Sequence, residues 1–547
     1  MRILLILLAL LLTACPDPSD DDDSSAANDD DSADDDDAPT LCETLGLSEA
    51  PWNAEGPYGS HRHELMDDFS VELHDGSTFT LSERWTGCDV LIVVPHTLAV
   101  SAQDPSTIWQ TDVLELALGS APNARYLFVT AASQSSADLL GPEMQTRVDE
   151  ALAAMDPEDR GWWSDRLHVA VPRAADLNNA AEDVLTGVGG RGFAVDRTQH
   201  VRGVGSYADV NRYDAALSAA DQWPWEANLA NARYEVEFLN WEATRQQLLD
   251  ADVDVLSIPV WQGEVTQEFT DIEVTFPDAA TLAPYDTLEI DIEQRCPNDD
   301  AAEFGNCGAW DYLAHVYVQD TATDAWIELV RYITTYHREG RWVIDATPAI
   351  PLLAQGGVRQ VRYEHAPSWN TQPTKTWLSF RFSDRSKGMK ASEAHPLFTG
   401  GSFNSAYNDG REPMEVAIPA TAQKVELYAI ITGHGADTSS CAEFCNHQHQ
   451  FTVNGESHLQ EWPIVGDDEG CAKTVGTGTV PNQGGTWWFG RGGWCPGRQV
   501  DPVRWDVTDL VTPGETATVS YRGLLNGNTP PANAGNIVMN SWLVVHE

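Results

Sequence analysis

The sequence predicts a multidomain fold in which an α/β module precedes two antiparallel β-sandwich domains of the jelly-roll type at the C-terminus. The chain has 547 residues, enough for about two to four domains with their own cores. A continuous apolar run at residues 90–94 is typical of a buried parallel strand. From about Asp254 onward, short alternating segments are separated by glycine, proline, asparagine and aspartate, which indicates antiparallel sheets.

The α/β module is expected over residues 41–230. Segments of helical length alternate there with short apolar segments, as in βαβ units, and a pair of short strand-like segments closes the module. The expected helices lie near residues 108–118 and 142–155, and the expected strands lie at residues 90–94, 125–130, 167–171, 192–196 and 200–204.

Two stretches of this module resemble a thioredoxin- or peroxiredoxin-like domain. Residues 75–82 resemble the segment that leads into the first buried strand, and residues 193–197 resemble the late hairpin of that fold. The resemblance implies a thioredoxin-like fold. The redox Cys-x-x-Cys motif is absent, because residues 95–98 read Pro-His-Thr-Leu. Since the nucleophilic thiol is missing, thiol–disulfide exchange is not expected, and the module is predicted to serve structure or recognition.

The two sandwich domains are expected over residues 254–385 and 390–547. A stretch rich in serine, glycine and lysine, residues 382–408, is expected to join them. Loops rather than sandwich cores carry function in such folds. The clearest predicted strands are residues 269–276, 287–292, 314–319, 326–333 and 424–431.

The N-terminus resembles a bacterial lipoprotein signal. Arg2 precedes an apolar run, residues 3–12, that is too short to span a membrane. The Leu-Thr-Ala-Cys ending resembles a lipobox, so residues 1–15 are predicted to be a signal peptide and Cys15 the lipidated residue. The alternative is an ordinary cleaved signal with an incidental cysteine. The first interpretation predicts an extracytoplasmic protein, anchored by lipid to a bacterial membrane at the outer membrane or cell surface.

The chain is strongly acidic. Residues 16–40 are almost wholly aspartate, serine, alanine and asparagine, which predicts an extended, disordered linker. The formal net charge is −52, of which this linker supplies roughly a quarter. The folded part is therefore acidic as well. Nucleic acid is excluded as a partner, because phosphate binding needs basic patches, and a solvated surface is the favoured interpretation.

The cysteines suggest a disulfide framework. There are nine, and if Cys15 carries lipid an even number remains for an oxidising compartment. Free or metal-bound thiols are the alternative. The Cys-x3-Cys pair has no second pair at zinc-site spacing, so neither a metal nor a cofactor is predicted. Local spacing suggests the pairs Cys296–Cys307, Cys441–Cys445 and Cys471–Cys495, which leaves Cys42 with Cys88.

Two short motifs combine a carboxylate, an aromatic ring and cysteine. Residues 307–312 read Cys-Gly-Ala-Trp-Asp-Tyr, and residues 441–445 read Cys-Ala-Glu-Phe-Cys. A carboxylate held beside an aromatic ring and partly shielded from water suits general acid/base chemistry on a sugar-bearing substrate. The twenty tryptophans are numerous, and exposed indoles of this kind stack on sugars, although core packing is the default for most of them.

From about residue 255 to the C-terminus, the chain resembles the peptide-N-glycosidase F family, amidases that release N-glycans from asparagine. Each motif alone is a weak signal, but together, in one colinear order and with the cysteine framework, they are specific. The motifs are Cys296-Pro-Asn, Cys307-Gly-Ala-Trp-Asp, the strand at 314–318, Arg331-Tyr-Ile-Thr, Tyr363-Glu, Gly433-His, Cys441-Ala-Glu-Phe-Cys and Arg491-Gly-Gly-Trp-Cys-Pro-Gly.

The resemblance implies the site. Its principal catalytic carboxylate corresponds to Asp311, expected to exchange protons with water or the amide. Glu443 is expected to hold the substrate amide and first sugar, and Glu364 to orient a water molecule. Several carboxylates in one cleft also push their pKa values apart. The residues expected to contact the carbohydrate are Trp310, Trp369, His434, Arg491 and Trp494; for Arg491 the alternative is to balance the charge of the acids.

Structural interpretations stand beside these roles. Asp311 alone would more often cap a turn, Glu443 would be a solvated loop acid, and Glu364 a surface residue. His434 satisfies a core hydrogen bond in its alternative interpretation, and Arg491 and Trp494 brace the loop closed by Cys471 and Cys495. The sequence His447-Gln-His449 suggests copper, but two histidines on one strand face without a third ligand are more often incidental.

The chain also departs from the family pattern. Tyr312 stands where the family has arginine after the catalytic aspartate, Thr432 and Phe444 replace tryptophans, and a further tryptophan is displaced to Trp369. These changes surround the sugar-facing cleft, so they affect specificity and rate more than reaction class.

The resemblance predicts a lipid-anchored glycoamidase that hydrolyses the link between N-acetylglucosamine and the asparagine side chain of N-glycoproteins or glycopeptides, working as a monomer. Its rival is a catalytically silent surface lipoprotein that binds glycans or proteins on the same scaffold. A weaker third hypothesis is a copper-dependent oxygenase on similar jelly rolls, which the absence of metal-ligand clusters in the sequence disfavours.

Overall fold

The structure, a computed structural model, describes residues 39–96, 109, 112–131, 133–188, 191–207, 228–436 and 441–547. The predicted signal peptide, Cys15 and nearly all of the acidic linker lie outside these residues, so they stay predictions. Residues 41–547 form one compact unit. Among the described helices, none is both long and apolar enough to cross a membrane.

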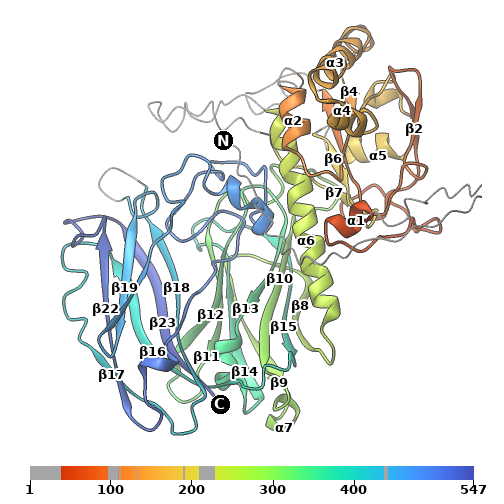
Figure 1. The fold of residues 1–547 in the computed structure, drawn as a ribbon. Coiled ribbons are helices and arrows are strands. Elements are labelled where there is room, and N and C mark those ends of the chain that lie inside the picture. Colours follow the sequence, from red (N-terminus) through yellow and green to blue (C-terminus); the bar gives the residue numbers. More distant parts are fainter. Residues whose placement is uncertain are drawn as a thin grey trace, which may run out of the picture. The chain divides into compact units, whose positions relative to one another are not determined.

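The first part of this unit is an α/β module, as predicted. Its main sheet has the order β5–β4–β3–β6–β7, with three parallel strands followed by two antiparallel ones (Figure 1). Residues of β3 and β4 are buried along their whole length, which explains their continuous hydrophobicity. The strands are β1 (Ser70–Glu72), β2 (Thr78–Thr80), β3 (Val90–His96), β4 (Ala124–Thr130), β5 (Leu167–Val169), β6 (Phe193–Val195) and β7 (Val201–Arg202).

The helices of the module differ in their bounds from the prediction. The Asp112 side chain caps α2 by accepting from the amides of Leu114 and Glu115. Pro142, expected to open a helix, lies inside α3, which begins eight residues earlier. The helices are α1 (Leu41–Thr44), α2 (Val113–Gly119), α3 (Gln134–Ala154), α4 (Pro157–Ser164) and α5 (Ala180–Gly187). The thioredoxin-like assignment of the module stays a prediction.

One long helix, α6 (Arg233–Ala251), has no counterpart in the prediction. It follows the 3-10 turn η4 (Leu229–Ala232) and runs between the α/β module and the first sandwich (Figure 1). Tyr234 and Phe238 of α6 pack with Tyr336 and Trp487 from the sandwich loops in one buried cluster. The module is therefore packed directly against the loops that carry the candidate site.

The first sandwich consists of two four-stranded antiparallel sheets, β13–β10–β15–β8 and β12–β11–β14–β9. Both sheets contribute to one core, in which Ile290 of β10 and Val316 of β11 are fully buried. Its elements are β8 (Leu256–Thr266), β9 (Phe269–Phe276), α7 (Ala279–Leu282), β10 (Thr287–Arg295), β11 (Leu313–Gln319), β12 (Trp326–Ile333), β13 (Gly340–Asp345), η5 (Thr347–Ala349), α8 (Ile350–Leu353), β14 (Gly357–Glu364) and β15 (Thr374–Ser383).

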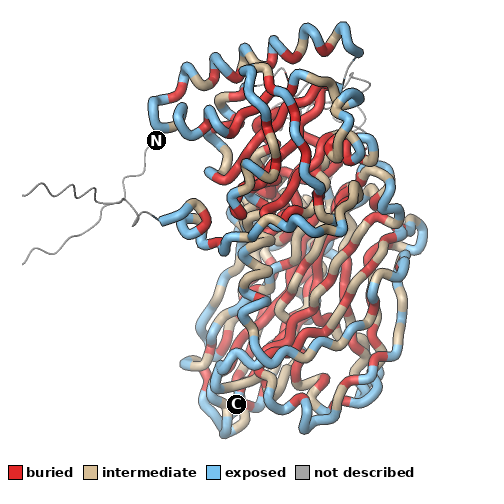
Figure 2. Tube along the Cα trace, turned by 90° about the vertical axis from the view of Figure 1, so that its right-hand side faces the viewer, coloured by how far each residue is buried: buried red, intermediate tan, exposed pale blue. Residues whose placement is uncertain are grey.

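The second sandwich repeats this plan with the sheets β16–β23–β18–β21 and β17–β22–β19–β20. Over the described residues as a whole, Figure 2 shows buried stretches of chain inside and exposed stretches at the surface. The two antiparallel sandwiches are therefore confirmed. The elements are β16 (Ala391–Ser402), β17 (Met414–Ala417), β18 (Lys424–His434), β19 (His447–Val453), β20 (Glu456–Gln460), η6 (Ala472–Thr477), β21 (Val503–Asp506), η7 (Thr508–Leu510), β22 (Thr516–Leu525) and β23 (Asn536–His546).

A buried arginine ties the two sandwiches together. Arg331 of β12 is bound twice by Glu328, at 2.9 and 2.8 Å. Its third nitrogen donates to Thr432 Oγ1 at 2.9 Å and to the Val538 carbonyl at 2.8 Å, both in the second sandwich. Since leaving such a charge unpaired in the interior is costly, this contact fixes the registry of the two domains and of the loops at their junction.

The disulfide prediction is right for three pairs and wrong for the fourth. Cys296–Cys307, Cys441–Cys445 and Cys471–Cys495 are bonded. Cys42 and Cys88 are buried, free thiols that share a small cluster with Leu47. Burial and the neighbouring Cys42 raise the pKa of the Cys88 thiol to about 12, so it is held as an unreactive thiol.

Candidate active site

Asp311 lies in the loop between Cys307 and β11, and both of its neighbours are fixed. The Trp310 amide donates to Gln372 Oε1 at 2.9 Å. Thr334 holds the other side, because its hydroxyl donates to the Trp310 carbonyl at 2.7 Å and accepts from the Tyr312 amide at 2.8 Å. The Cys296–Cys307 disulfide anchors the start of the loop. The carboxylate is thus placed by backbone contacts on both sides.

Glu443 comes from the second sandwich, inside the small loop closed by Cys441 and Cys445. Its amide donates to the Gly435 carbonyl at 3.1 Å, and its carbonyl accepts from the Gly492 amide at 2.7 Å. Gly492 has to be glycine, because a Cβ there would lie 2.2 Å from His447 Nε2. This close approach brings the loop after Gly490 against the loop of Glu443.

Arg491 lies between the two acids. Its Nε donates to Glu443 Oε1 at 3.1 Å, and its Nη2 lies 3.6 Å from Asp311 Oδ2. The guanidinium is 1% exposed and also donates to the carbonyls of Thr486 and Phe489, each at 3.1 Å. Carboxylates from separate sandwiches therefore meet at one fixed cation.

The electrostatics leave Asp311 poised to titrate. Burial raises its pKa to about 6, an effect that Glu443 reinforces, while Arg491 and a hydrogen bond from the Tyr336 hydroxyl oppose it. Burial, with Asp311 beside it, raises the pKa of Tyr336 well above its usual value. Tyr336 therefore stays a neutral donor, and Asp311 changes charge near neutral pH, as acid/base catalysts do.

Two tryptophans predicted to contact carbohydrate are exposed to solvent near Asp311, and that role stays a prediction. Trp310 is 48% exposed and Trp369 is 78% exposed. Trp369 meets the Tyr312 ring edge-on at 5.9 Å, and Asn370 Nδ2 donates to the Tyr312 hydroxyl at 2.7 Å. Large indoles left in solvent beside a fixed carboxylate are suited to stack on sugar rings.

Two other predicted contact residues are placed differently. Trp494 is only 6% exposed; its Nε1 donates to the Gly433 carbonyl at 2.8 Å, and its ring lies 4.8 Å from the Arg491 guanidinium. The indole thus braces Arg491, and the predicted stacking of Trp494 on substrate stays a prediction. For Arg491 the charge-balancing alternative fits, since its nitrogens are occupied by the protein.

His434 also has a structural role in this arrangement. Its ring stacks on Trp494 at 5.3 Å, and its Nε2 shares a hydrogen bond of 2.8 Å with Thr432 Oγ1. Burial lowers its pKa to about 3, so the imidazole is neutral. The predicted contact between His434 and substrate is not tested by these interactions.

Glu364 is not joined to the other acids. It ends β14 and pairs with His315 of β11 and Phe269 of β9. Within the described residues, no ion pair or hydrogen bond links its carboxylate to Asp311, Glu443 or Arg491. Its predicted role stays a prediction.

The His447–His449 pair is part of the core. The two rings share a hydrogen bond of 2.8 Å, and His449 Nδ1 bonds the Tyr521 hydroxyl at 2.7 Å. Burial lowers the pKa of His447 to about 4. Their nitrogens facing each other and Tyr521 are occupied, so the structure supports the incidental interpretation.

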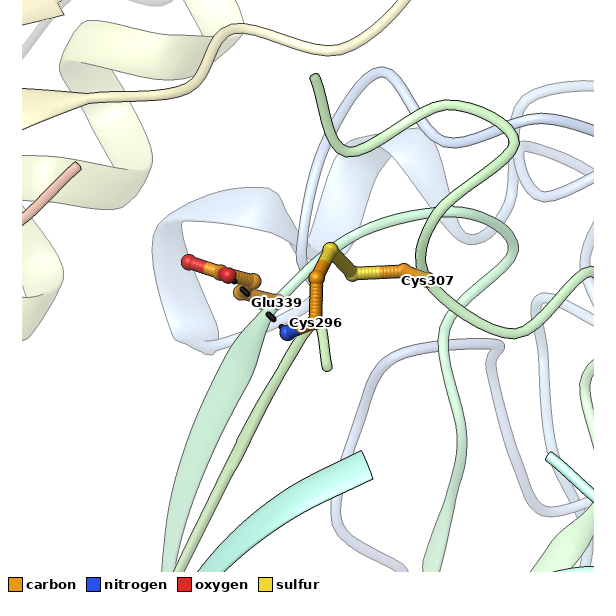
Figure 3. Close-up of side chains that lie close together, drawn as sticks. All are labelled: Cys296, Cys307 and Glu339. Atoms are coloured by element: carbon orange, nitrogen blue, oxygen red, sulfur yellow. Dashed lines mark hydrogen bonds between the residues drawn. A yellow bond between two sulfur atoms is a disulfide. The ribbon is translucent and has the colours of Figure 1, made fainter. Parts of the chain in front are cut away.

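Among the described residues, one further group of cysteine and acidic side chains lies close enough together to suggest a metal: Cys296, Cys307 and Glu339 (Figure 3). The two sulfur atoms are bonded to each other, so neither is a thiolate ligand. Glu339 accepts from the Cys296 amide and from Arg62, each at 3.0 Å, and pairs with His63 at 2.9 Å. These residues do not fit a metal centre.

Tyr336 is the site residue that the sequence analysis missed. It lies two positions after the quoted Arg331-Tyr-Ile-Thr motif, and its hydroxyl bonds Asp311. The position next to a specific motif was the available signal. Hydrophobicity alone gave no signal, because a tyrosine that bonds a site carboxylate and a tyrosine that only packs in the core look the same in sequence.

Comparison with known proteins agrees with this geometry. Residues 402–544 match the family described as peptide-N-glycosidase F, C terminal. The chain is 28% identical over 274 residues to peptide-N4-(N-acetyl-β-D-glucosaminyl)asparagine amidase F of Elizabethkingia miricola, which covers 46% of this chain and 71% of that protein.

Solved structures were compared as well. A crystal structure of peptide-N4-(N-acetyl-β-D-glucosaminyl)asparagine amidase is 20% identical, with a TM-score of 0.45, and covers 54% of this chain and 96% of that one. PNGase F from Flavobacterium meningosepticum, described as a glycosylasparaginase, has the same identity and TM-score and covers 53% and 96%. By the matched C-terminal domain and the curated relative, the chain is similar to the peptide-N-glycosidase F family.

Proposed function

We propose that this protein is a peptide-N-glycosidase that hydrolyses the amide bond between N-acetylglucosamine and asparagine in N-glycoproteins or glycopeptides. The observation that carries the proposal is the pairing of Asp311 and Glu443, from separate sandwiches, with the single buried Arg491. The name of the Elizabethkingia relative supports the same substrate class.

The reaction needs water to add to the side-chain carbonyl carbon, the carbon–nitrogen bond to break, and the departing glycosylamine nitrogen to gain a proton. Asp311 accepts the proton of the attacking water and returns one to the nitrogen, a cycle that suits a pKa of about 6. Glu443 holds the amide and first sugar. Glu364, at the end of β14 beside β11, orients a water. The products are aspartate and a glycosylamine.

Arg491 acts by positioning rather than by touching the sugar. With Glu443 it forms a fixed pair, and its charge keeps Asp311 from becoming a permanently neutral acid. Phe444 lies 5.2 Å from the guanidinium. An aromatic ring of the Cys-x3-Cys loop thus lies beside Arg491, although this chain has phenylalanine where the family pattern has tryptophan.

Among the departures from the family pattern, Tyr312 is the one that directly follows Asp311 in the sequence. It packs beside Trp369 and Asn370 at the rim, where the family pattern has a charged arginine. An uncharged rim of tyrosine and tryptophan favours neutral sugars over acidic ones next to Asp311. We therefore place the substrate's neutral N-acetylglucosamine against this rim.

The test is direct. The full chain is incubated with a denatured N-glycoprotein in 18O-labelled water, and mass spectrometry follows conversion of glycosylated asparagine to labelled aspartate. Release of glycan with label in the aspartate supports the proposal. Absence of cleavage at every pH tested, with retained glycan binding, would instead identify the protein as a catalytically silent glycan-binding lipoprotein.

We further propose that the protein is extracytoplasmic, monomeric and attached to a bacterial membrane through lipid on Cys15, followed by the acidic linker. The lipobox-like sequence and the three disulfides support this location. Cys15→Ala should move the protein from the membrane fraction to the soluble fraction; unchanged fractionation would refute the anchor.

A further inference from the structure

A second cavity lies away from the candidate active site, where α6, the segment after β6 and the edge of β13 meet. We call it the junction cavity. Its volume is about 490 Å³, within the range of small-molecule sites. Its walls combine charged side chains with the apolar groups of Phe238, Leu239 and Ala243 on α6.

Most charges in the junction cavity are already paired. Arg202 binds Asp196 at 3.2 Å and Glu242 at 2.6 Å. Arg338 binds Glu235 and Glu303, each at 2.9 Å. Two more acids in the wall also have cations: Glu293 pairs with Arg295, and Glu339 pairs with Arg62 and His63. The wall holds seven acids and six arginines in all, and apart from Arg197 its arginines are each paired with at least one acid, so they offer little affinity for an added anion.

Arg197 is different. It is 5% exposed and lines the cavity, yet within the described residues its Nε and Nη2 have no hydrogen-bond partner, and no acid pairs with it. A neighbouring group that senses its charge is the Cys88 thiol, which burial keeps neutral. A buried guanidinium without an anion is costly, and an anion from solution is the group that would satisfy it.

We propose that the junction cavity binds an acidic sugar, with its carboxylate on Arg197 and its ring against α6. Arg197 is a wall guanidinium that no acid pairs with among the described residues, and it matches one carboxylate. Planar guanidinium groups bind carboxylates in a bidentate fork. Ser48, Thr198 and Gln247 in the wall offer hydroxyl and amide groups to sugar hydroxyls. The apolar side of α6 accommodates the less polar face of a ring.

The site is independent of the proposed amidase activity, because none of its residues belongs to the Asp311–Glu443–Arg491 cluster. It lies where the α/β module meets the first sandwich, and its wall contains residues of both. Binding there gives the module the recognition role that its missing redox motif leaves open.

The test compares glucuronate with glucose on the full chain by isothermal titration and ligand-observed NMR. The two sugars share a ring and differ at the carboxylate. We expect millimolar or tighter binding of glucuronate and at least about tenfold weaker binding of glucose, the effect of one charge-assisted interaction. Sulfate serves as a third probe. Failure of glucuronate to bind, or equal binding of both sugars, overturns the proposal.

Variants locate the site. Arg197→Gln should reduce glucuronate affinity about tenfold or more, whereas Arg197→Lys keeps the charge and should retain preference for glucuronate over glucose. Glu293→Gln combined with Arg295→Gln removes a matched ion pair of the same cavity and should leave affinity nearly unchanged, as should Asp311→Asn in the active site. Loss of binding in Asp311→Asn, or sulfate binding as tight as glucuronate, contradicts an acidic-sugar site at Arg197.

Discussion

The candidate active site and the junction cavity each contain a buried arginine, but only one of the two arginines faces acids. In the first, Arg491 faces two carboxylates. In the second, Arg197 has no acid partner among the described residues. Burial is similar for both guanidinium groups, at 1% and 5% exposure. The two sites therefore differ in whether acids face the buried arginine.

The Asp311 carboxylate and the unpaired Arg197 guanidinium are suited to different functions. Burial, reinforced by the charge of Glu443, raises the pKa of Asp311 to about 6, which gives a group that takes up and releases protons. Arginine does not titrate in the accessible range, so the unpaired guanidinium of Arg197 gives binding alone. We therefore expect proton transfer at the junction of the two sandwiches and ligand binding at the junction with the α/β module.

The largest expected effect is on cleavage by Asp311→Asn, a change that should leave the junction cavity untouched. Asp311→Asn preserves shape but removes the proton acceptor, and kcat/KM for glycopeptide cleavage should fall about a thousandfold. Glu364→Gln, outside the Arg491 cluster, should cost less. Glucuronate binding in the junction cavity should be unaffected by either. Cleavage by Asp311→Asn at more than about a tenth of the wild-type rate would rule out Asp311 as the proton acceptor.

The second effect is on stability. Arg491→Gln leaves Glu443 and Asp311 without their shared cation, and the free energy of unfolding should fall by about 3 kcal/mol at about pH 8. In the folded protein the pKa of Asp311 is raised to about 6, above its value in the unfolded chain. Asp311 is therefore protonated at about pH 5, and the loss of unfolding free energy should be smaller there than at about pH 8.

Urea denaturation at both pH values measures this difference. The control is Arg362→Gln, which removes the partner of Asp271 at a half-exposed pair and should cost under about 1 kcal/mol. An equal loss at the two pH values would mean that Asp311 is not part of the charge cluster in solution.

Sequence reasoning reached the sandwiches and the acids but not what surrounds them. The motifs at Cys307 and Cys441 pointed to Asp311 and Glu443, which the structure brings to one arginine, Arg491; their catalytic roles stay predictions. Exposure was not readable: Trp494 and Trp369 look equally suited to stack on sugar, yet one braces Arg491 and the other lies in solvent. Helix α6 was missed because its buried side carries Glu235, whose charge is neutralised by Arg338 from another domain, and no local pattern reveals such a partner.

A smaller effect tests how the active-site pKa is set. In the wild type, the rate should rise with pH through the Asp311 pKa of about 6, since the ionised carboxylate is the active form. Tyr336→Phe removes a hydrogen bond that favours the carboxylate. The pKa of Asp311 should therefore rise, and the ascending limb of the pH–rate profile should move to higher pH.

The readout is the position of the limb rather than the maximal rate, which a merely structural change would also lower. Tyr407→Phe serves as the control, because this buried tyrosine bonds Tyr521 away from the acids and should leave the limb in place. A limb that stays fixed or moves to lower pH in Tyr336→Phe would show that the tyrosine does not donate to the Asp311 carboxylate.

The smallest effect concerns the rim. Trp369 is 78% exposed, so Trp369→Ala removes little buried surface and should leave the unfolding free energy within about 0.5 kcal/mol. If the indole stacks on the sugar, KM should rise about fivefold to tenfold with kcat nearly constant, the signature of lost ground-state binding. Trp162, on α4 of the α/β module and also exposed, supplies the matched control, since Trp162→Ala should leave KM unchanged. A KM that does not change in Trp369→Ala would move the sugar contact to Trp310, on the Asp311 loop itself, and would confine recognition there to the residues that also fix the catalytic carboxylate.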